Sequence, residues 1–196
     1  MSRYEIVVMG TSLGGLHALE TVLGRLPECF PVPVAVVQHR GKNSDDTLTQ
    51  LLRRYTSLKV YDAEDKMPLE PGSVYLSPPN YHLLVEDGYL ALSCDAPVLY
   101  ARPSIDVLFE SAAESYGSRT VGVIMTGASS DGAQGIAAIK RRGGVAIAQD
   151  PSTAEARTMP AAAIAAAGVD KILPLEEIGP YLAALCGSEM QRTGQH

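Results

Sequence analysis

Short apolar runs alternate with amphipathic stretches along most of this sequence. The first run, at residues 5–9, leads into a glycine-rich turn and then into leucines and valines at helical spacing, which predicts a strand, a tight turn and a helix. The same order returns after the run at residues 34–37. Continuous apolar strands separated by helices are typical of a parallel sheet that is covered on both faces. The pattern therefore predicts a doubly wound, three-layer α/β/α domain with a mostly parallel sheet.

The same periodicities predict the remaining elements. Residues 81–86 and 89–93 flank Asp87-Gly88, a strong two-residue turn signal, so an antiparallel hairpin is expected to interrupt the parallel order. Residues 1–186 are expected to form one domain, and residues 187–196, which lack periodicity, a flexible tail. Further strands are expected at residues 58–61, 73–76, 121–125 and 145–148, and further helices around 48–55, at 104–116, from about 131, at 159–167 and at 176–185.

Composition narrows the class of protein. A chain of 196 residues can bury a core without disulfides or metals, and its net charge of −6 offers no basic stripe for nucleic acid. The cysteines, Cys29, Cys94 and Cys186, have no C-x-x-C spacing, which argues against a zinc site and favours a reducing cytoplasm. No apolar run approaches the roughly 20 residues that cross a bilayer. We expect a cytoplasmic protein with no membrane insertion, metal or cofactor.

Three residues with complementary chemistry follow three of the expected strands. Ser12 comes after the first strand, His39 after the second, and Asp131 after the strand that ends at Met125. Ligands of open parallel sheets bind at the carboxyl ends of the strands. A serine hydroxyl needs an imidazole to accept its proton, and a carboxylate orients that imidazole. The sequence therefore suggests a catalytic triad, with the backbone N–H of Leu13 as the natural first oxyanion donor.

Each of these residues also has a purely structural interpretation. Ser12 could be an ordinary N-cap of the helix that follows it, and Asp131 could form a capping box with Gln134. His39 could be a loop histidine without a chemical role. Three triad chemistries at three strand ends are harder to explain by independent capping, which favours the triad.

From residue 4 to residue 185 the chain resembles the catalytic domain of the bacterial chemotaxis methylesterases, the CheB-type family. The segments that carry the resemblance are GTSLGG (10–15), VVQHR (36–40), EPGSVYLSPPNYHLLVEDG (70–88), RPSIDVLFESAAESYG (102–117), GVIMTGASSDGAQG (122–135), IAQDPST (147–153) and MPAAAI (159–164).

The resemblance implies a serine hydrolase that removes methyl esters from glutamate side chains in the helical region of chemoreceptors, often with deamidation of selected glutamines. It places the nucleophile on Ser12, the base on His39 and the orienting carboxylate on Asp131. It also implies an oxyanion and substrate pocket at Leu13 and Ala128. The chain departs from the family pattern at both pocket positions, and at residues 157–158, where Arg-Thr replaces a common Tyr-Gly pair.

Two other classes of function compete with this interpretation. One is a non-catalytic regulatory or receptor-binding domain with the same fold, against which the intact serine, histidine and aspartate argue. The other is a nucleotide-binding domain, but GTSLGG does not match G-x-G-x-x-G and no ribose-binding acid follows the second strand. Family enzymes usually carry an N-terminal receiver domain. Because the first strand begins within a few residues of Met1, we expect constitutive activity, with any receiver on a separate protein.

Overall fold

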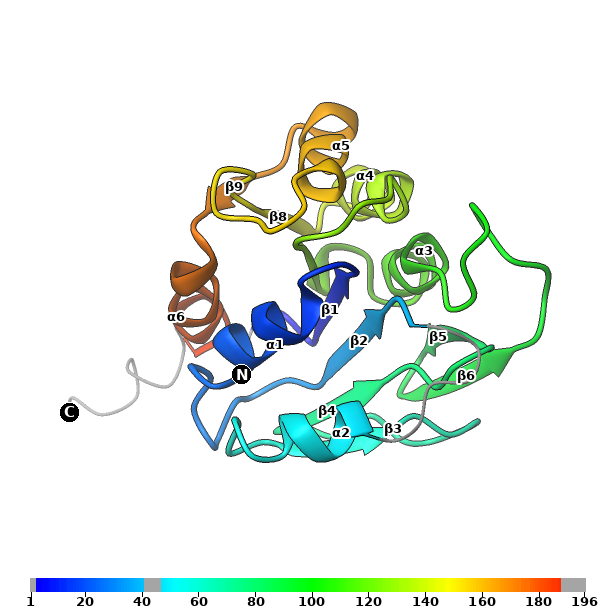
Figure 1. Cartoon of the computed structure of the whole chain (residues 1–196). Coiled ribbons are helices and arrows are strands. Elements are labelled where there is room, and N and C mark those ends of the chain that lie inside the picture. The colour runs from blue at the N-terminus through cyan, green and yellow to red at the C-terminus, as the bar shows by residue number, and fades with distance from the viewer. Residues whose placement is uncertain (1–2, 41–46, 188–196) are drawn as a thin grey trace.

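The computed structural model describes residues 3–40 and 47–187, and a seven-stranded sheet forms its centre (Figure 1). Every neighbouring pair in this sheet is parallel. The strands, in spatial order, are β3 (Lys59–Asp62), β4 (Ser73–Leu76), β2 (Val34–Gln38), β1 (Ile6–Thr11), β7 (Thr120–Ile124), β8 (Val145–Gln149) and β9 (Lys171–Leu173).

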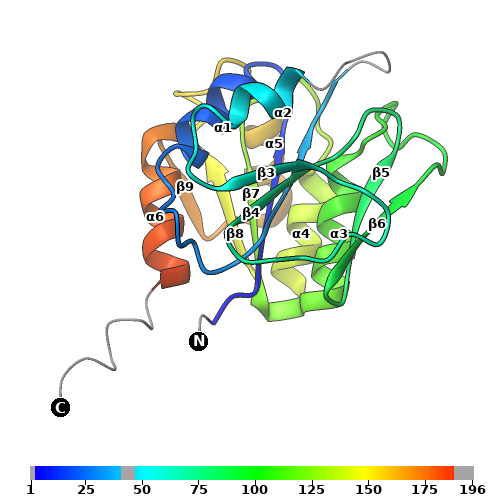
Figure 2. The ribbon, with the colours of Figure 1, turned by 90° about the horizontal axis from the view of Figure 1, so that it is seen from below.

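Helices cover both faces of the sheet, as Figures 1 and 2 show. One face carries α1 (Gly15–Leu23), α2 (Thr47–Leu52) and α6 (Leu175–Gly187), whose apolar residues share one core. The other face carries α3 (Ile105–Tyr116), α4 (Ala133–Arg141) and α5 (Thr158–Ala167), whose apolar residues share the second core. A short 3-10 turn, Gly117–Arg119, leads from α3 into β7.

Alternation along β1 explains why residues 6–9 are all apolar. Val7 and Met9 belong to one core, whereas Ile6 and Val8 belong to the other, and all four side chains are fully buried. Successive residues of a strand point to opposite faces, so a strand between two helical layers has no polar side. The predicted doubly wound three-layer fold is therefore confirmed.

The expected antiparallel hairpin forms a separate two-stranded sheet of β5 (His82–Glu86) and β6 (Tyr89–Ser93). Its turn passes through Gly88, whose φ of 86° lies in the left-handed region that glycine adopts without strain. The hairpin packs on α3, where Ser111 and Ser115 hydrogen-bond to the backbone of Val85. It therefore lies beside the parallel sheet instead of extending it.

Some predicted boundaries differ from the structure. The edge strand β9 has only three residues, too few to show a period in the sequence, and was not predicted. The flexible tail was predicted for residues 187–196, but Gly187 is the last residue of α6, and residues 188–196 lie outside the described residues. Within the described part of the chain, no helix combines the length and hydrophobicity required to cross a bilayer.

The chain reverses direction across the sheet at β1. From β1 it passes through α1 to β2 on one side, and it later returns through α3 to β7 on the other side. The loops after β1, β2 and β7 therefore meet above the carboxyl edge of the sheet, at the switch point where ligands of such folds bind.

Candidate active site

Backbone pairing at the end of the sheet brings the first two candidate residues together. Ser12 and His39 directly follow the paired residues Thr11 and Gln38, and the His39 N–H donates to the Thr11 carbonyl at 3.0 Å. The Ser12 N–H donates in turn to the carbonyl of Thr126, just past β7, at 2.9 Å. Three strand ends are therefore joined by main-chain hydrogen bonds beneath the site.

The imidazole of His39 contacts the carboxylate of Asp131, with 2.7 Å between Nε2 and Oδ2. The Asp131 side chain is fully buried, whereas 16% of the His39 side chain is exposed. An ionised carboxylate only accepts hydrogen bonds, so Nε2 must carry the proton in this pair. The Nδ1 atom of neutral His39 then holds the lone pair that can accept a proton.

The Asp131 carboxylate also accepts hydrogen bonds from the N-terminus of α3. Oδ1 accepts from the Ser104 hydroxyl at 2.9 Å and from the Asp106 N–H at 3.0 Å, while Oδ2 accepts from the Ile105 N–H at 2.7 Å. Burial by itself would raise the pKa of Asp131, but the hydrogen bonds from His39 and from the α3 backbone outweigh burial and lower that pKa. Asp131 therefore stays ionised beside the imidazole.

Both simple capping interpretations are wrong. The N-cap of α4 is Gly132, which has no side-chain cap, and Asp131 instead binds the start of α3. The N-cap of α1 is Gly14 in a left-handed conformation with φ of 79°, so Ser12 does not cap that helix either. A capping box requires the carboxylate to turn back on its own helix, and here a neighbouring helix start offers more donors.

A second buried carboxylate, Asp106, reciprocates the contact between the two helices. Its Oδ1 accepts from the N–H groups of Gly132 and Gly135 at the start of α4, at 2.9 and 2.7 Å. The pKa of Asp106 is raised to about 6, first by burial, which the hydrogen bond from Gly135 only partly offsets, and then by the charge of Asp131. Asp131, just before α4, thus binds the start of α3, and Asp106, in the first turn of α3, binds the start of α4.

The turn after β1, which carries Ser12, borders a cavity of about 630 Å³. Ser12, Leu13 and His39 are among the residues that line it. Leu13 is 55% exposed, and within the described residues its N–H has no hydrogen-bond acceptor. A Cβ on Gly127 would lie 3.0 Å from the Ser12 Cβ, so glycine leaves room for the serine. Among the described residues no hydrogen bond joins Ser12 to His39, and such contacts commonly tighten only when substrate binds.

Gln38 connects the two halves of the site and was not singled out from the sequence. Its Nε2 donates to the Ser12 carbonyl at 2.9 Å and to the His39 carbonyl at 2.8 Å. A Cβ on Gly15 would lie only 1.8 Å from Gln38 Oε1, so Gly15 makes space for this amide. A polar residue at the end of a wholly apolar strand, in VVQH, was the signal that could have revealed it.

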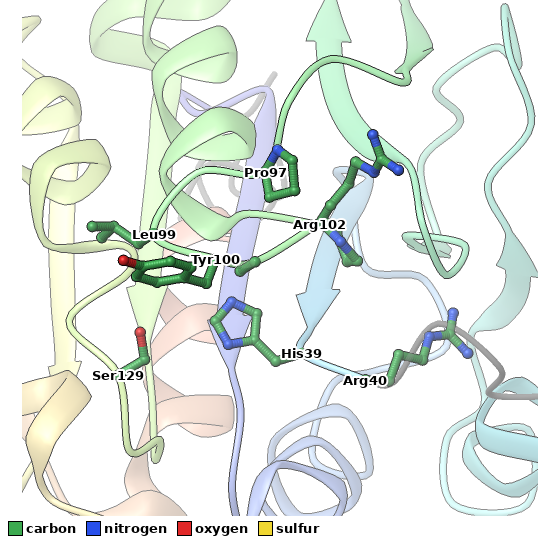
Figure 3. A pocket seen from close by; sticks show the side chains of 9 residues that line it. His39, Arg40, Pro97, Leu99, Tyr100, Arg102 and Ser129 are labelled. Carbon is green, nitrogen blue, oxygen red and sulfur yellow. The ribbon is translucent and has the colours of Figure 1, made fainter.

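A second cavity, of about 480 Å³, also has His39 in its lining (Figure 3). Leu99, Tyr100 and Arg102 line it together with Ser129, whose hydroxyl accepts from the Asp131 N–H at 3.0 Å. Ala128 is exposed and lines neither of these two cavities. Its expected role in the pocket stays a prediction.

His82 lines neither cavity and holds the backbone at Ser104, beside Asp131. It is buried, its Nδ1 accepts from the Ser104 N–H at 3.2 Å, and its Nε2 donates to the Ala96 carbonyl at 3.1 Å. Among residues 3–40 and 47–187, no cluster of three histidine, cysteine, aspartate or glutamate side chains is arranged to hold a metal ion.

Sequence comparison identifies the family of this site. Residues 7–182 match the family described as CheB methylesterase. The chain belongs to the CheB methylesterase family. The CheB methylesterase catalytic domain of Thermotoga maritima, whose crystal structure is known, is 35% identical and superposes with a TM-score of 0.89, covering 93% of this chain and 98% of that one.

Two further relatives differ in how much of their length the chain covers. A Leptospira interrogans protein with the provisional name protein-glutamate methylesterase/protein-glutamine glutaminase is 45% identical over 97% of this chain and 99% of its own length. The protein-glutamate methylesterase FrzG of Myxococcus xanthus is 40% identical over 91% of this chain, which spans only 54% of FrzG. CheB methylesterase domains therefore occur both in proteins of this size and within longer ones.

Proposed function

We propose that this chain is a protein-glutamate methylesterase that hydrolyses γ-glutamyl methyl esters on chemoreceptors, with Ser12 as nucleophile, His39 as general base and Asp131 as orienting carboxylate. The observation that supports it most is the 2.7 Å contact between His39 and the buried, ionised Asp131, beside the half-buried Ser12 on the adjacent strand end. Membership of the CheB methylesterase family supports the choice of substrate.

The reaction follows from the protonation states of these groups. Ser12 Oγ attacks the γ-carbonyl carbon as its proton moves to His39 Nδ1, and the Nε2–H bond to Asp131 stabilises the imidazolium that forms. The Leu13 N–H, which has no acceptor within the described residues, donates to the developing oxyanion. Collapse of the intermediate expels methanol, which takes the proton from Nδ1.

Water completes the cycle. His39 Nδ1 accepts a proton from the water molecule that attacks the acyl-Ser12 carbonyl carbon, and this proton returns to Ser12 Oγ as the ester bond breaks. The products are a γ-carboxylate and the free hydroxyl. A glutamine amide would react in the same way, with ammonia as leaving group, and the names of the relatives, which include protein-glutamine glutaminase, favour this second activity.

Methanol release from methylated chemoreceptor membranes tests the proposal directly. The purified chain should release methanol, and Ser12→Ala should release none above background. A fluorophosphonate probe should label the wild-type chain once and leave Ser12→Ala unlabelled. A folded wild-type chain that neither releases methanol nor reacts with the probe would support the alternative, a non-catalytic receptor-binding domain.

A further inference from the structure

A tight turn between β6 and α3 carries two apolar side chains in an unusual backbone conformation. Val98 and Ala101 exchange two backbone hydrogen bonds, of 3.0 and 2.8 Å, so Leu99 and Tyr100 are the central residues of a two-residue turn. Their φ angles are 45° and 64°. Positive φ at both central positions is the requirement of a type I′ turn, which strongly prefers Asn-Gly. Leucine and tyrosine are strained there.

Packing inside the chain does not compensate for this strain. Leu99 is 53% exposed, and Tyr100 is as exposed as a residue can be, at 104% of the reference area. Most strained residues persist because surrounding structure holds them, and they gather at functional sites. An aromatic ring left entirely in solvent on a strained turn contributes little to folding, and its exposed face is free to contact another molecule.

The base of this segment is held by other residues. Arg102 donates to two backbone carbonyls of residues 94–96, at 2.8 and 2.9 Å, and His82 donates to a third at 3.1 Å. Arg102 also donates to Asn80 Oδ1 at 2.8 Å. The turn is thus presented on an anchored support, and neither apolar side chain is needed to hold it.

The turn lies at the rim of the candidate active site. Leu99 and Tyr100 line the 480 Å³ cavity that also contains His39 and Arg102, and Figure 3 shows the two apolar side chains on one side of His39 and Arg102 on the other. The 630 Å³ cavity, which shares His39 with this one, also has an exposed leucine in its lining, Leu16.

We propose that the Leu99-Tyr100 turn docks the stretch of the substrate protein that adjoins the esterified glutamate. This inference rests on the proposed function, because an ester on a protein side chain reaches Ser12 only if its flanking chain covers the cavity rim. A rigid aromatic side chain at such a rim buries a large area at low entropic cost. The guanidinium of Arg102, in the same cavity, keeps its positive charge while it holds the support of the turn, and this charge suits substrate segments with carboxylates near the ester.

The double substitution Leu99→Asn with Tyr100→Gly tests the docking surface, because it gives the turn its preferred residues and removes both side chains. On methylated chemoreceptor membranes, kcat/KM should fall by about tenfold, mainly through a higher KM. On a small-molecule ester the loss should be at least about fivefold smaller. Because the substitutions relieve backbone strain, we expect a Tm at or above that of the wild type. Such a Tm would exclude unfolding as the cause of the lower kcat/KM.

The matched control is Tyr55→Ser, since Tyr55 is 52% exposed and lines neither cavity. Its kinetics on both substrates should equal those of the wild type. Unchanged kcat/KM of the double variant on receptor membranes, or equal losses on both substrates, would overturn the docking surface while leaving the proposed function intact. A wild-type chain that releases no methanol from these membranes would instead overturn the proposed function, and the docking surface with it.

Discussion

The N-termini of α1 and α3 lie at the same edge of the sheet but are treated in opposite ways. The start of α3 is filled by the chain's own side chains, because the Ser104 hydroxyl accepts from the Val107 N–H and Asp131 accepts from two further N–H groups. The start of α1 has no side-chain cap, and Leu13, which precedes the N-cap Gly14, is exposed. Both ends carry the partial positive charge of a helix N-terminus.

The two helix N-termini therefore have different roles, one in folding stability and the other in the reaction. At α3 an internal carboxylate uses the helix donors, becomes ionised in a buried place and holds His39 in one tautomer. Beside α1 the N–H of Leu13 has no acceptor within the described residues, and we expect it to bind an anion that exists only during the reaction. Substitutions at the α1 end should therefore affect turnover alone, whereas substitutions at the α3 end should affect turnover and folding together.

Ser12→Ala should have the largest effect on turnover, and it should test the role of the α1 end without affecting the α3 end. Turnover of the methyl ester should fall by about 10⁴-fold or more, because no other side chain can form the acyl intermediate. The free energy of unfolding should change by less than about 1 kcal/mol, since Ser12 caps nothing. Methanol release and urea denaturation measure the two quantities. A large loss of stability would show that the serine has a folding role.

Asp131→Asn should lower both turnover and the free energy of unfolding. Turnover should fall by about 10³- to 10⁴-fold, because an amide favours the wrong imidazole tautomer. Stability should fall by about 1–3 kcal/mol, because donors converge on both carboxylate oxygens and the amide nitrogen must face some of them. If Asp131 only capped α4, asparagine would keep that cap and stability would change little, and the contacts with α3 reverse that expectation.

Asp170→Asn is the matched control for this loss of a carboxylate. Asp170 accepts from the Ala146 N–H at 2.8 Å and pairs with Lys140, with neither residue lining the two cavities. This variant should lose stability while turnover stays at the wild-type level. If Asp131→Asn kept full turnover, Asp131 would be only a link between helices.

Gln38→Met should have an intermediate effect, because it removes the hydrogen bonds from one amide to the Ser12 and His39 carbonyls. We expect kcat to fall by about 10- to 100-fold with little change in KM, since misplacement of the reacting groups affects the chemical step. Ser111→Ala also loses two hydrogen bonds, to Val85 and Leu108, on the hairpin side of α3. It should leave kcat unchanged. Equal kcat values for the two variants would reduce Gln38 to a structural role.

The periodic parts of the fold were predictable from sequence, and the contacts between distant segments were not. β1 could be predicted because Ile6 to Met9 are continuously apolar, as their side chains pack alternately into the two cores. The three-residue edge strand β9 was missed because a period needs more length than it has. The strand-end rule selected Ser12, His39 and Asp131 for the site, since parallel strand ends share an edge.

What sequence could not supply was the partner of each side chain. Asp131 and Asp106 each bind a helix that begins about 25 residues away in the chain, and no local pattern records such an exchange. The strained turn at Leu99-Tyr100 was equally invisible, because its residues contradict the usual preference for Asn-Gly. Local rules fail most where tertiary contact or function overrides them.

Asp106→Asn should have the smallest effect on turnover and should change how stability depends on pH. The pKa of Asp106 is about 6 in the folded chain, raised by burial and by the charges of Asp131 and Glu110, against an ordinary value of 3.8. A raised carboxyl pKa means that the folded state binds the proton more tightly than the unfolded state. The stability due to this proton is complete below about pH 4 and is lost as pH rises through about 6.

Asparagine cannot lose a proton, and its Oδ1 can still accept from Gly132 and Gly135. The free energy of unfolding of the variant, minus that of the wild type, should therefore rise by about 1–3 kcal/mol between about pH 4 and pH 7.5. Asp131, whose lowered pKa acts with the opposite sign, is present in both proteins, so most of its contribution cancels in the difference. Urea denaturation of both proteins at several pH values measures this difference in the free energy of unfolding. A difference that stayed constant with pH would mean that Asp106 keeps an ordinary pKa, and that its contact with α4 is not coupled to the charge on Asp131.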